Sequence, residues 1–196
     1  MAFKNMIGHN SIISLNVGNE GNTQKNKIGE QAVPRIVEFL QKSSILQFLN
    51  LRSTVLGDQG ITLLSEGLKD SKTLFYLNVA KNDLTACGME ALAKVLVSTE
   101  IVELDVSFNP LGNAGITELT GALTDKYRTV GTRTFRNLTK LNLSECSFQQ
   151  AGAYKLFKAM VDYRSIETLI LDGNLFTGKA NKKMDTFKEA MCNSRL

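Results

Sequence analysis

Residues 74–84 read LFYLNVAKNDL, which is the pattern Leu-x-x-Leu-x-Leu-x-x-Asn-x-Leu with valine at the third apolar position. The same pattern runs through the chain about six times, with other apolar residues replacing leucine in some copies. The first apolar position of each copy falls at Ile12, Leu46, Leu74, Ile101, Leu138 and Ile166. The intervals are 34, 28, 27, 37 and 28 residues, and inserted loops account for the two long ones. A repeat of this length and regularity predicts a solenoid of stacked units.

Each copy is expected to begin with a short β-strand, because apolar residues alternate with other residues after the first anchor. The inward positions of these strands are Leu15, Leu49, Leu77, Leu104, Leu141 and Leu169, followed two residues later by Val17, Leu51, Val79, Val106, Leu143 and Leu171. The asparagine column of the pattern contains Asn26, Thr54, Asn82, Asn109, Cys146 and Asn174. An asparagine amide at this position satisfies backbone groups that a tight bend leaves unpaired. Thr54 and Cys146 are interpreted as weaker structural substitutes.

A helix is expected to follow each bend. It contains a small residue that is expected to let the helix pack closely against its strand, at Ala32, Gly60, Gly88, Gly115, Gly152 and Ala180. Apolar residues four and eight positions further on give the helical spacing. In the sixth copy the spacing fails at Lys188, so Phe187 and Met191 are expected to form the cap that an open solenoid needs. The predicted organisation is a cap segment over residues 1–11, an array of six repeats over 12–180 and a capping helix over 181–196.

Together these motifs resemble the ribonuclease-inhibitor-like class of leucine-rich repeats, in which units of about 28 residues each contain a full α-helix. The resemblance extends from Ile12 to the C-terminus. It implies an α/β fold, a horseshoe-shaped solenoid with a parallel sheet on its concave face and helices on its convex face. For function it implies a wide range, which includes enzyme inhibitors, immune sensors, GTPase activators, actin-end binders and effectors secreted by intracellular bacteria.

The composition indicates one soluble domain. The chain has 196 residues, of which 43% are apolar, enough for a continuous core. No apolar run approaches the roughly 18 residues that span a bilayer, so neither a signal peptide nor a membrane anchor is expected. Three cysteines without metal-ligand spacing favour a reducing compartment. The expected location is the cytoplasm, or the host cytosol if the protein is a secreted bacterial effector.

Residues suited to catalysis are scarce. The single histidine, His9, precedes the first repeat and is interpreted as a surface or capping residue rather than a general base. Residues 173–180 read GNLFTGKA and match the Gly-x-x-x-x-Gly-Lys of a phosphate-binding loop. They lack the final Ser or Thr that binds magnesium, and Asn174 and Phe176 already belong to the repeat. The sequence therefore predicts a non-enzyme with no catalytic residue, no metal site and no cofactor.

The concave face of the predicted sheet is the candidate binding surface. Stacked parallel strands lie about 4.8 Å apart, so six of them give a face roughly 24 Å across. Its outward positions include aromatic residues that the repeat does not require, with charged residues beside them. The candidate partner-binding residues are Phe48, Arg52, Tyr76, Lys81, Glu103, Asp105, Phe108 and Lys140. Aromatic and arginine anchors in polar surroundings are typical of interface hot spots.

A simpler interpretation of this face stays open. Flanking loops would then cover Phe48 or Phe108, and the polar column that begins at Asn16 would only solvate the sheet. Two insertions, over residues 18–27 and 125–137, are also candidate functional elements, because long polar loops in such a stack are often functional. The second insertion is expected to contact an acidic partner through Lys126, Tyr127, Arg128, Arg133 and Arg136. Nucleic acid is disfavoured as a partner, because the concave face carries both signs of charge.

These observations predict a non-catalytic protein that is a monomer when unbound and grips a folded partner protein on its concave face. Members of the class that it resembles inhibit enzymes by covering the active site, so inhibition is the favoured mechanism. A small bacterial effector that acts on a host protein or on another effector fits the same interpretation. The alternatives are a GTPase activator, which the short array and the lack of an acidic tail disfavour, and a scaffold such as an actin-end binder or ciliary component.

Overall fold

The computed structural model describes residues 11–19, 21, 26–69, 71–124, 126–127 and 137–176. Several sequence-based predictions fall outside these residues. They are residues 1–10 of the expected N-terminal cap with His9, most of the two insertions, Cys192, and the expected capping helix over residues 181–196.

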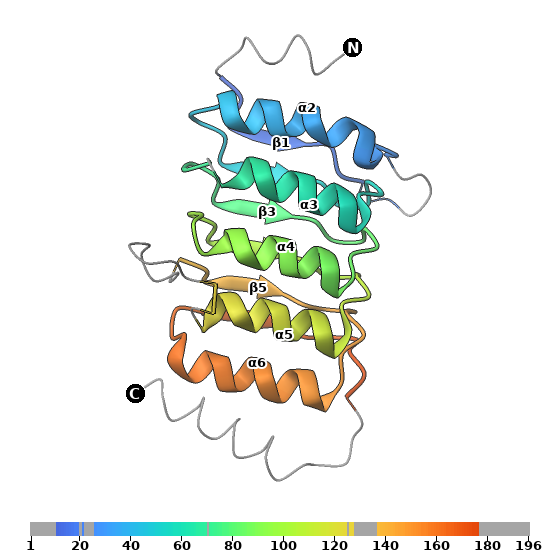
Figure 1. The fold of residues 1–196 in the computed structure, drawn as a ribbon, viewed down its shortest axis with the longest axis vertical. Coiled ribbons are helices and arrows are strands. Elements are labelled where there is room, and N and C mark those ends of the chain that lie inside the picture. Colours follow the sequence, from blue (N-terminus) through green and yellow to red (C-terminus); the bar gives the residue numbers. More distant parts are fainter. Residues whose placement is uncertain are drawn as a thin grey trace.

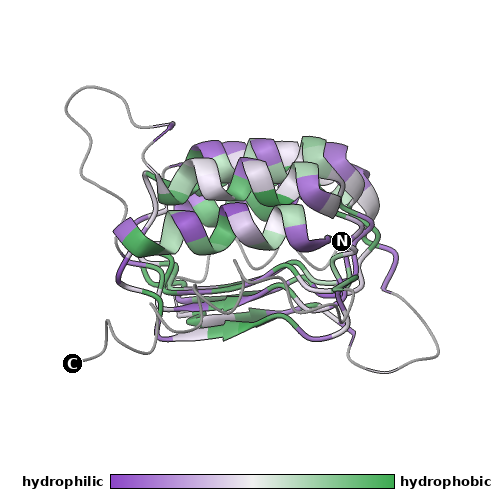
Figure 2. Cartoon of the chain, turned by 90° about the horizontal axis from the view of Figure 1, so that it is seen from below, coloured by the Kyte–Doolittle hydropathy of each residue, from purple (hydrophilic) through white to green (hydrophobic). Residues whose placement is uncertain are grey.

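Strand and helix alternate along the described chain, as the repeat predicts. The strands are β1 Ser14–Asn16, β2 Phe48–Asn50, β3 Tyr76–Asn78, β4 Glu103–Asp105, β5 Lys140–Asn142 and β6 Thr168–Ile170. The helices are α2 Gly29–Lys42, α3 Gly57–Leu68, α4 Ala86–Leu96, α5 Gly112–Leu123 and α6 Gln150–Asp162. Each helix lies beside the next in sequence order (Figure 1). Seen along the stack, the helices form one layer and the strands the other (Figure 2).

The six strands form one parallel sheet in sequence order, β1 to β6. The inward leucines are in register across it, for example Leu49 with Leu77 and Leu77 with Leu104. The predicted α/β solenoid and its register are therefore confirmed. These three leucines are at most 2% exposed. Together with the inward side chains of the helices they form one continuous core between the two layers.

The helices begin in two different ways, which the repeat pattern alone does not predict. Three of them, α2, α3 and α5, begin at a glycine with φ between 58° and 61°. The other two begin after an extended residue, Thr85 or Gln149. The backbone N–H of Thr85 donates to Asp58 Oδ1 at 2.7 Å, and that of Gln149 donates to Asn113 Oδ1 at 2.9 Å. At the start of each of these two helices, a side chain of the preceding helix thus accepts a hydrogen bond from a backbone N–H that has no partner within its own helix.

In helices α4 and α6 the small residue of the repeat packs against a different element from the one predicted. A Cβ added at Gly88 would lie 2.5 Å from Asp58 Oδ1, and one added at Gly152 would lie 2.7 Å from Asn113 Oδ1. Both glycines also donate their backbone N–H to these same oxygens at 3.0 Å. The close approach there is between neighbouring helices, so the prediction that helix and strand meet at this position is wrong for α4 and α6.

The asparagines of the bend column satisfy backbone groups, as predicted, and they also join successive repeats, because some of those groups belong to the preceding repeat. Asn82 accepts the backbone N–H of Thr54 at 2.9 Å and donates to the carbonyl of Leu51 at 2.7 Å. Asn109 makes the equivalent bonds one repeat later, to the N–H of Asn82 at 2.9 Å and the carbonyl of Val79 at 3.1 Å. These amides are fully buried, where water does not reach the backbone groups of the bend. Each amide therefore provides the hydrogen-bond partner that these groups would otherwise lack.

Cys146 occupies the same column and is fully buried. Its Sγ lies 3.4 Å from the carbonyl oxygen of Val106, a weak hydrogen bond in the place of the asparagine amide. Burial raises the pKa of the Cys146 thiol to about 12, so the group is protonated and unreactive near neutral pH. This environment suits a structural thiol and does not suit a nucleophile.

Candidate functional site

The candidate site is the side of the sheet that points away from the helices, which we call the sheet face. It is the face predicted to be concave. The first residues of the strands form one row across it, because strand pairing puts Phe48 opposite Tyr76, Tyr76 opposite Glu103, and Glu103 opposite Lys140. Seven of the eight candidate residues lie in or just beyond strands β2 to β4, and Lys140 begins β5, so the fold gathers them on the middle of one surface.

Aromatic side chains are exposed on this face. Phe48 is 44% exposed and Phe108 is 47% exposed, so the described residues leave both rings uncovered, while most of the two inserted loops lies outside those residues. Tyr76 is half-buried, and its ring centroid lies 6.1 Å from that of Phe48 in a tilted arrangement. Phe108 lies at the other end of the strands, where the Arg52 guanidinium carbon sits 5.1 Å from its ring centroid. This is the geometry of a cation–π contact.

The third residue of each of the strands β1 to β5 forms a turn with its own backbone. Its side-chain oxygen accepts the N–H of the residue two positions on, at 2.9–3.1 Å, in Asn16, Asn50, Asn78, Asp105 and Asn142. Asn50 and Asn78 are at most 9% exposed. The expectation that this column only solvates the sheet is therefore wrong, since these side chains end the strands.

Two of the charged candidates form an ion pair on the sheet face. Lys140 Nζ lies 2.7 Å from Glu103 Oε1 across strands β4 and β5, with side chains 52% and 38% exposed. The hydrogen bond from Lys140 to Glu103 raises the pKa of the lysine. At this exposure the pair contributes little to stability, and its effect is to fix two opposite charges in the row.

Lys81 is separate from these groups. It follows β3 in a left-handed conformation with φ of 56°, and its ammonium makes no hydrogen bond or ion pair with any residue in the described part of the chain. The structure thus brings together Phe48 with Tyr76, Arg52 with Phe108, and Glu103 with Lys140, and leaves Lys81 as an unpaired cation beside them.

A hollow of about 160 Å³ lies between the side chains of strands β3 to β6. Besides the inward Leu104 and Leu141, the residues that line it are Tyr76, Glu103, Asp105, Lys140, Asn142, Thr168 and Ile170. Four of these seven residues were candidates from the sequence. Asp105 is half-buried there, and its second oxygen, Oδ2, is 3.4 Å from the Asn78 amide nitrogen.

Three residues of the face were missed by the sequence analysis. Phe75 is 42% exposed just before β3, and Ile170 is 39% exposed beside the hollow. Asn78 donates from one amide nitrogen to the Tyr76 hydroxyl at 3.2 Å and to Asp105. A signal existed for Ile170, because the other five repeats have Asn or Asp at its position, whereas the column of Phe75 also contains Ile13 and Val102. Asn78 gave no such signal, since asparagine recurs in its column.

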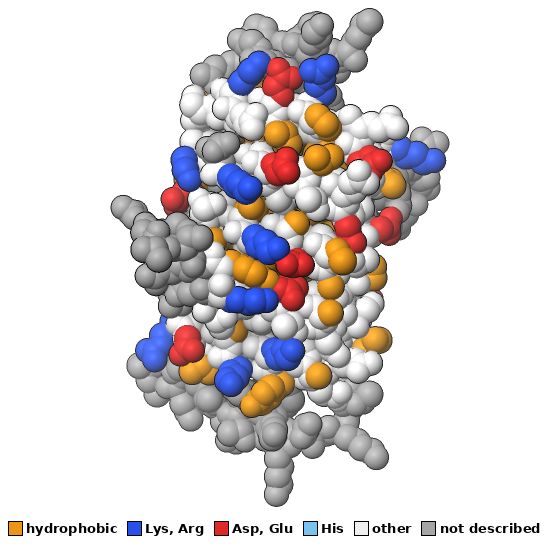
Figure 3. All heavy atoms as spheres, viewed as in Figure 1, with side chains coloured by type: hydrophobic (Ala, Val, Ile, Leu, Met, Phe, Trp, Pro, Cys, Tyr) orange, Lys and Arg blue, Asp and Glu red, His pale blue; other side chains and the backbone are white. Residues whose placement is uncertain are grey.

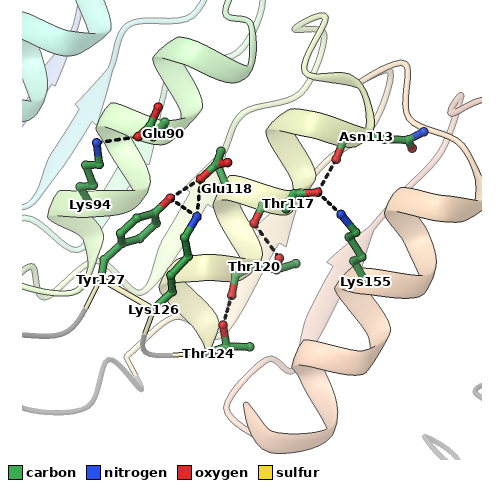
Figure 4. Close-up of polar contacts among 10 residues, drawn as sticks. All are labelled: Glu90, Lys94, Asn113, Thr117, Glu118, Thr120, Thr124, Lys126, Tyr127 and Lys155. Carbon is green, nitrogen blue, oxygen red and sulfur yellow. Dashed lines mark hydrogen bonds and ion pairs between the residues drawn. The ribbon is translucent and has the colours of Figure 1, made fainter.

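The beginning of the second insertion is packed against helix α5 (Figure 4). Lys126 Nζ lies 3.0 Å from Glu118 Oε2, and the Tyr127 hydroxyl donates to the same oxygen. These two bonds lower the pKa of Glu118. The Tyr127 ring also covers Gly121, where an added Cβ would meet it at 2.8 Å. Lys126 and Tyr127 are therefore engaged by the fold, while Arg128, Arg133 and Arg136 lie outside the described residues.

The helix side of the molecule has a different surface. Acidic and basic side chains are interspersed over the helices (Figure 3). They pair mostly within one helix, as in Lys94 with Glu90 at 2.6 Å and Lys42 with Glu38 at 2.8 Å. Such exposed pairs one helical turn apart stabilise a helix slightly and serve as a solvated surface.

Within the described ranges, no group of three or more His, Cys, Asp or Glu residues could hold a metal ion. None of the helices placed by the structure is both long enough and apolar enough to cross a membrane. In the motif that resembles a phosphate-binding loop, Asn174 accepts the N–H of Cys146 at 2.9 Å and donates to the carbonyl of Leu143 at 2.7 Å. That asparagine is occupied by the bend, and residues 177–180 of the motif lie outside the described chain.

Comparison with protein families identifies leucine-rich repeats over residues 70–93, 97–119 and 136–157. These ranges contain the strands of the third, fourth and fifth repeats and the first part of the helix that follows each strand, so these units match the leucine-rich-repeat pattern. Comparison with curated proteins gives no match.

Two solved structures have similar repeats. Leiomodin-1 actin-binding site 2 shares 15% identity at a TM-score of 0.45, over 99% of this chain and 94% of that one. Rad7, from its complex with Elc1 in yeast, shares 16% identity at a TM-score of 0.46, over 88% of this chain and 52% of that one. This chain thus spans about half the length of the Rad7 chain. The fold is a leucine-rich-repeat α/β solenoid.

Proposed function

We propose that this protein is a non-catalytic interaction module that binds a folded partner protein on its sheet face. The observation that carries the proposal is the exposure of Phe48 and Phe108, both more than 40% exposed, at positions where the repeat requires no apolar side chain. While these aromatic rings are exposed in the free protein, the favourable free energy of burying their apolar surface is not gained. A partner that covers them recovers that burial, which is why aromatic anchors dominate interface energetics.

The surroundings of the aromatic residues also suit a protein partner. Arg52 is already held over Phe108, so less conformational entropy is lost when a partner contacts its guanidinium. The Glu103–Lys140 pair and Lys81 supply charges of both signs around the rings. A face roughly 24 Å across, with aromatic and arginine anchors inside a polar rim, is comparable with one side of an ordinary protein interface.

Within this proposal, inhibition is the favoured mechanism: the sheet face covers the active site of an enzyme. The protein is then a monomer when unbound and acts in the cytoplasm, or in a host cytosol if it is a secreted effector. The rival functions share the fold but predict different effects on the partner. A GTPase activator would accelerate GTP hydrolysis, and a scaffold would leave the activity of its partner unchanged.

The proposal is tested by site-specific photocrosslinking of the full chain. A p-benzoyl-phenylalanine is placed at Phe108 on the sheet face, and in a matched chain at Lys94 on helix α4. We expect the Phe108 chain to crosslink one folded protein in a lysate of its source cells, and the Lys94 chain to leave that protein uncrosslinked. Crosslinking of the same protein only from Lys94 would contradict the proposal.

The purified partner then decides between the mechanisms. If it is an enzyme, addition of this protein at a one-to-one ratio is expected to abolish turnover of its substrate, and the Phe108→Ala variant is expected to inhibit more weakly. Stimulated GTP hydrolysis would identify the activator alternative, and unchanged activity in a stable complex would identify a scaffold.

A further inference from the structure

Asp105 is the one acidic residue in the third strand position of the five repeats that form the turn described above. The other four repeats have asparagine there: Asn16, Asn50, Asn78 and Asn142. In all five, one side-chain oxygen accepts the backbone N–H two residues on, and for Asp105 Oδ1 and the N–H of Ser107 this distance is 2.9 Å. Because an amide oxygen suffices in four repeats, the turn does not explain the negative charge of Asp105.

The charge of Asp105 is not balanced by a described cation. No lysine or arginine in the described part of the chain lies within ion-pair distance of its carboxylate, and Lys140 on the neighbouring strand is paired with Glu103 at 2.7 Å. The Oδ2 atom instead accepts a long hydrogen bond, at 3.4 Å, from the Asn78 amide, which is a neutral donor. A half-buried carboxylate is partly desolvated, so a cation supplied from outside would gain more there than on an open surface.

The hollow beside Asp105 has the form of a site for the end of one side chain. Its volume of about 160 Å³ is comparable with cavities of about 150 Å³ that accommodate a benzene ring. Tyr76 provides an aromatic wall, and Ile170 provides an apolar wall on the far side. The Asn78 amide donates to the Tyr76 hydroxyl at 3.2 Å and also faces Asp105, so it holds the ring and the carboxylate in position before any partner binds.

From this geometry we propose that the hollow binds a cationic side chain, arginine or lysine, of the partner protein. The cation pairs with Asp105 Oδ2 and packs against the Tyr76 ring, which combines a charge-assisted hydrogen bond with a cation–π contact. The inference rests on the proposed function, because it names the chemistry of the group that the partner presents to the same face. It also assigns different parts to the two acids of the hollow: Glu103 holds Lys140, and Asp105 receives the partner.

The test is an NMR titration of the ¹⁵N-labelled full chain with N-acetyl-arginine amide and, separately, N-acetyl-lysine amide. We expect saturable amide shifts at Tyr76, Asp105 and Ile170 with at least one of the two. N-acetyl-citrulline amide has nearly the shape of the arginine compound but no charge. We expect its affinity to be lower by about tenfold or more, which is the scale of one charge-assisted hydrogen bond.

The Asp105→Asn variant separates the charge from the turn. It keeps the oxygen that accepts the Ser107 N–H, so its spectrum is expected to show the same fold, while its affinity for the cationic amide falls about tenfold or more. The matched control is Glu145→Gln, which makes the same change in net charge at an exposed residue that does not line the hollow. We expect that variant to bind the amide like the original chain.

Three results would overturn the inference: no shifts at the hollow with either cationic amide, equal binding of the citrulline amide, or unchanged affinity in Asp105→Asn. The proposed function is judged separately, by crosslinking from Phe108. If that crosslink forms and the hollow binds no cation, the sheet face is an interface and only the chemistry assigned to Asp105 is wrong.

Discussion

Asparagines form two columns in this solenoid, one at the bends and one at the ends of the strands, and the two regions use the same side chain differently. At the bends, Asn82 and Asn109 are fully buried and bond to the backbone of the preceding repeat. On the sheet face, Asn50 and Asn78 bond to their own chain two residues on. The bend column therefore joins repeats by bonding the backbone of the preceding one, whereas the strand column bonds the backbone of its own repeat.

This difference determines how a departure from asparagine should be interpreted. At the bend, Cys146 is enclosed by the core and can only affect the fold. On the sheet face, Asp105 keeps the oxygen that the turn requires and adds a charge beside a hollow. A substitution in the first region is evidence about stability, and a substitution in the second region is evidence about binding.

The largest effect is expected at the bend, from Asn109→Ala. The change removes bonds to the N–H groups of Asn82 and Leu84 and to the carbonyls of Val79 and Val106. Each buried group left without a partner costs about 1–3 kcal/mol, so the free energy of unfolding is expected to fall by about 3 kcal/mol or more. Urea denaturation followed by circular dichroism measures it. A loss below about 1 kcal/mol would show that the bend column does not join the repeats as described.

The matched change on the sheet face is Asn78→Ala, for which a smaller loss of about 1 kcal/mol is expected. Only one backbone bond is lost, to the N–H of Ala80, together with the contacts to Tyr76 and Asp105. The same urea titration gives the comparison. If Asn78→Ala destabilises the protein as much as Asn109→Ala, the distinction between the two columns is wrong.

Val55, next to the bend column, is expected to be a site of strain. It is a β-branched residue at φ of 61°, where Asp83 and Ser147 stand in other repeats. Val55→Asn should raise the free energy of unfolding by up to about 1 kcal/mol, because asparagine tolerates the left-handed conformation better. The control is Val161→Asn, at an exposed position within helix α6, where no gain is expected. An equal gain in both variants would remove backbone strain as the explanation.

The smallest effect is expected from Cys146→Asn. The amide can donate to the carbonyls of Val106 and Ser144, which now face the thiol at 3.4 and 3.5 Å. Stability and partner binding should therefore stay unchanged or improve slightly. Thermal unfolding and a binding titration check both. Loss of binding with an intact fold would reveal a function of the thiol and contradict its structural assignment.

Much of the fold could be predicted from the sequence, because the same spacing of apolar residues and asparagines recurs in each repeat. Leu77 and Leu104 could be placed in one core, and Asn82 and Asn109 at the bends, from spacing alone. The caps of helices α4 and α6 could not be predicted, because Asp58 and Asn113 act on the following repeat. Periodicity within one unit contains no information about such a contact.

The candidate site could be predicted less completely. Outward strand positions identified Phe48 and Tyr76, since the repeat needs no aromatic residue there. The hollow could not be found in this way, because it depends on the space between side chains of four strands. Asp105 was a candidate for its charge, but its part in the turn became apparent only from the 2.9 Å contact with the Ser107 N–H.

The central claim is that the sheet face, and not the helix side, binds a protein partner. Its most direct test is the dissociation constant of the purified partner for Tyr76→Ala and Lys94→Ala, with folding checked by circular dichroism. Tyr76→Ala is expected to weaken binding by about 2 kcal/mol or more, and Lys94→Ala by almost nothing, because Lys94 only pairs with Glu90 on an exposed helix. If Lys94→Ala weakens binding and Tyr76→Ala does not, the partner binds the helix side and the account is wrong.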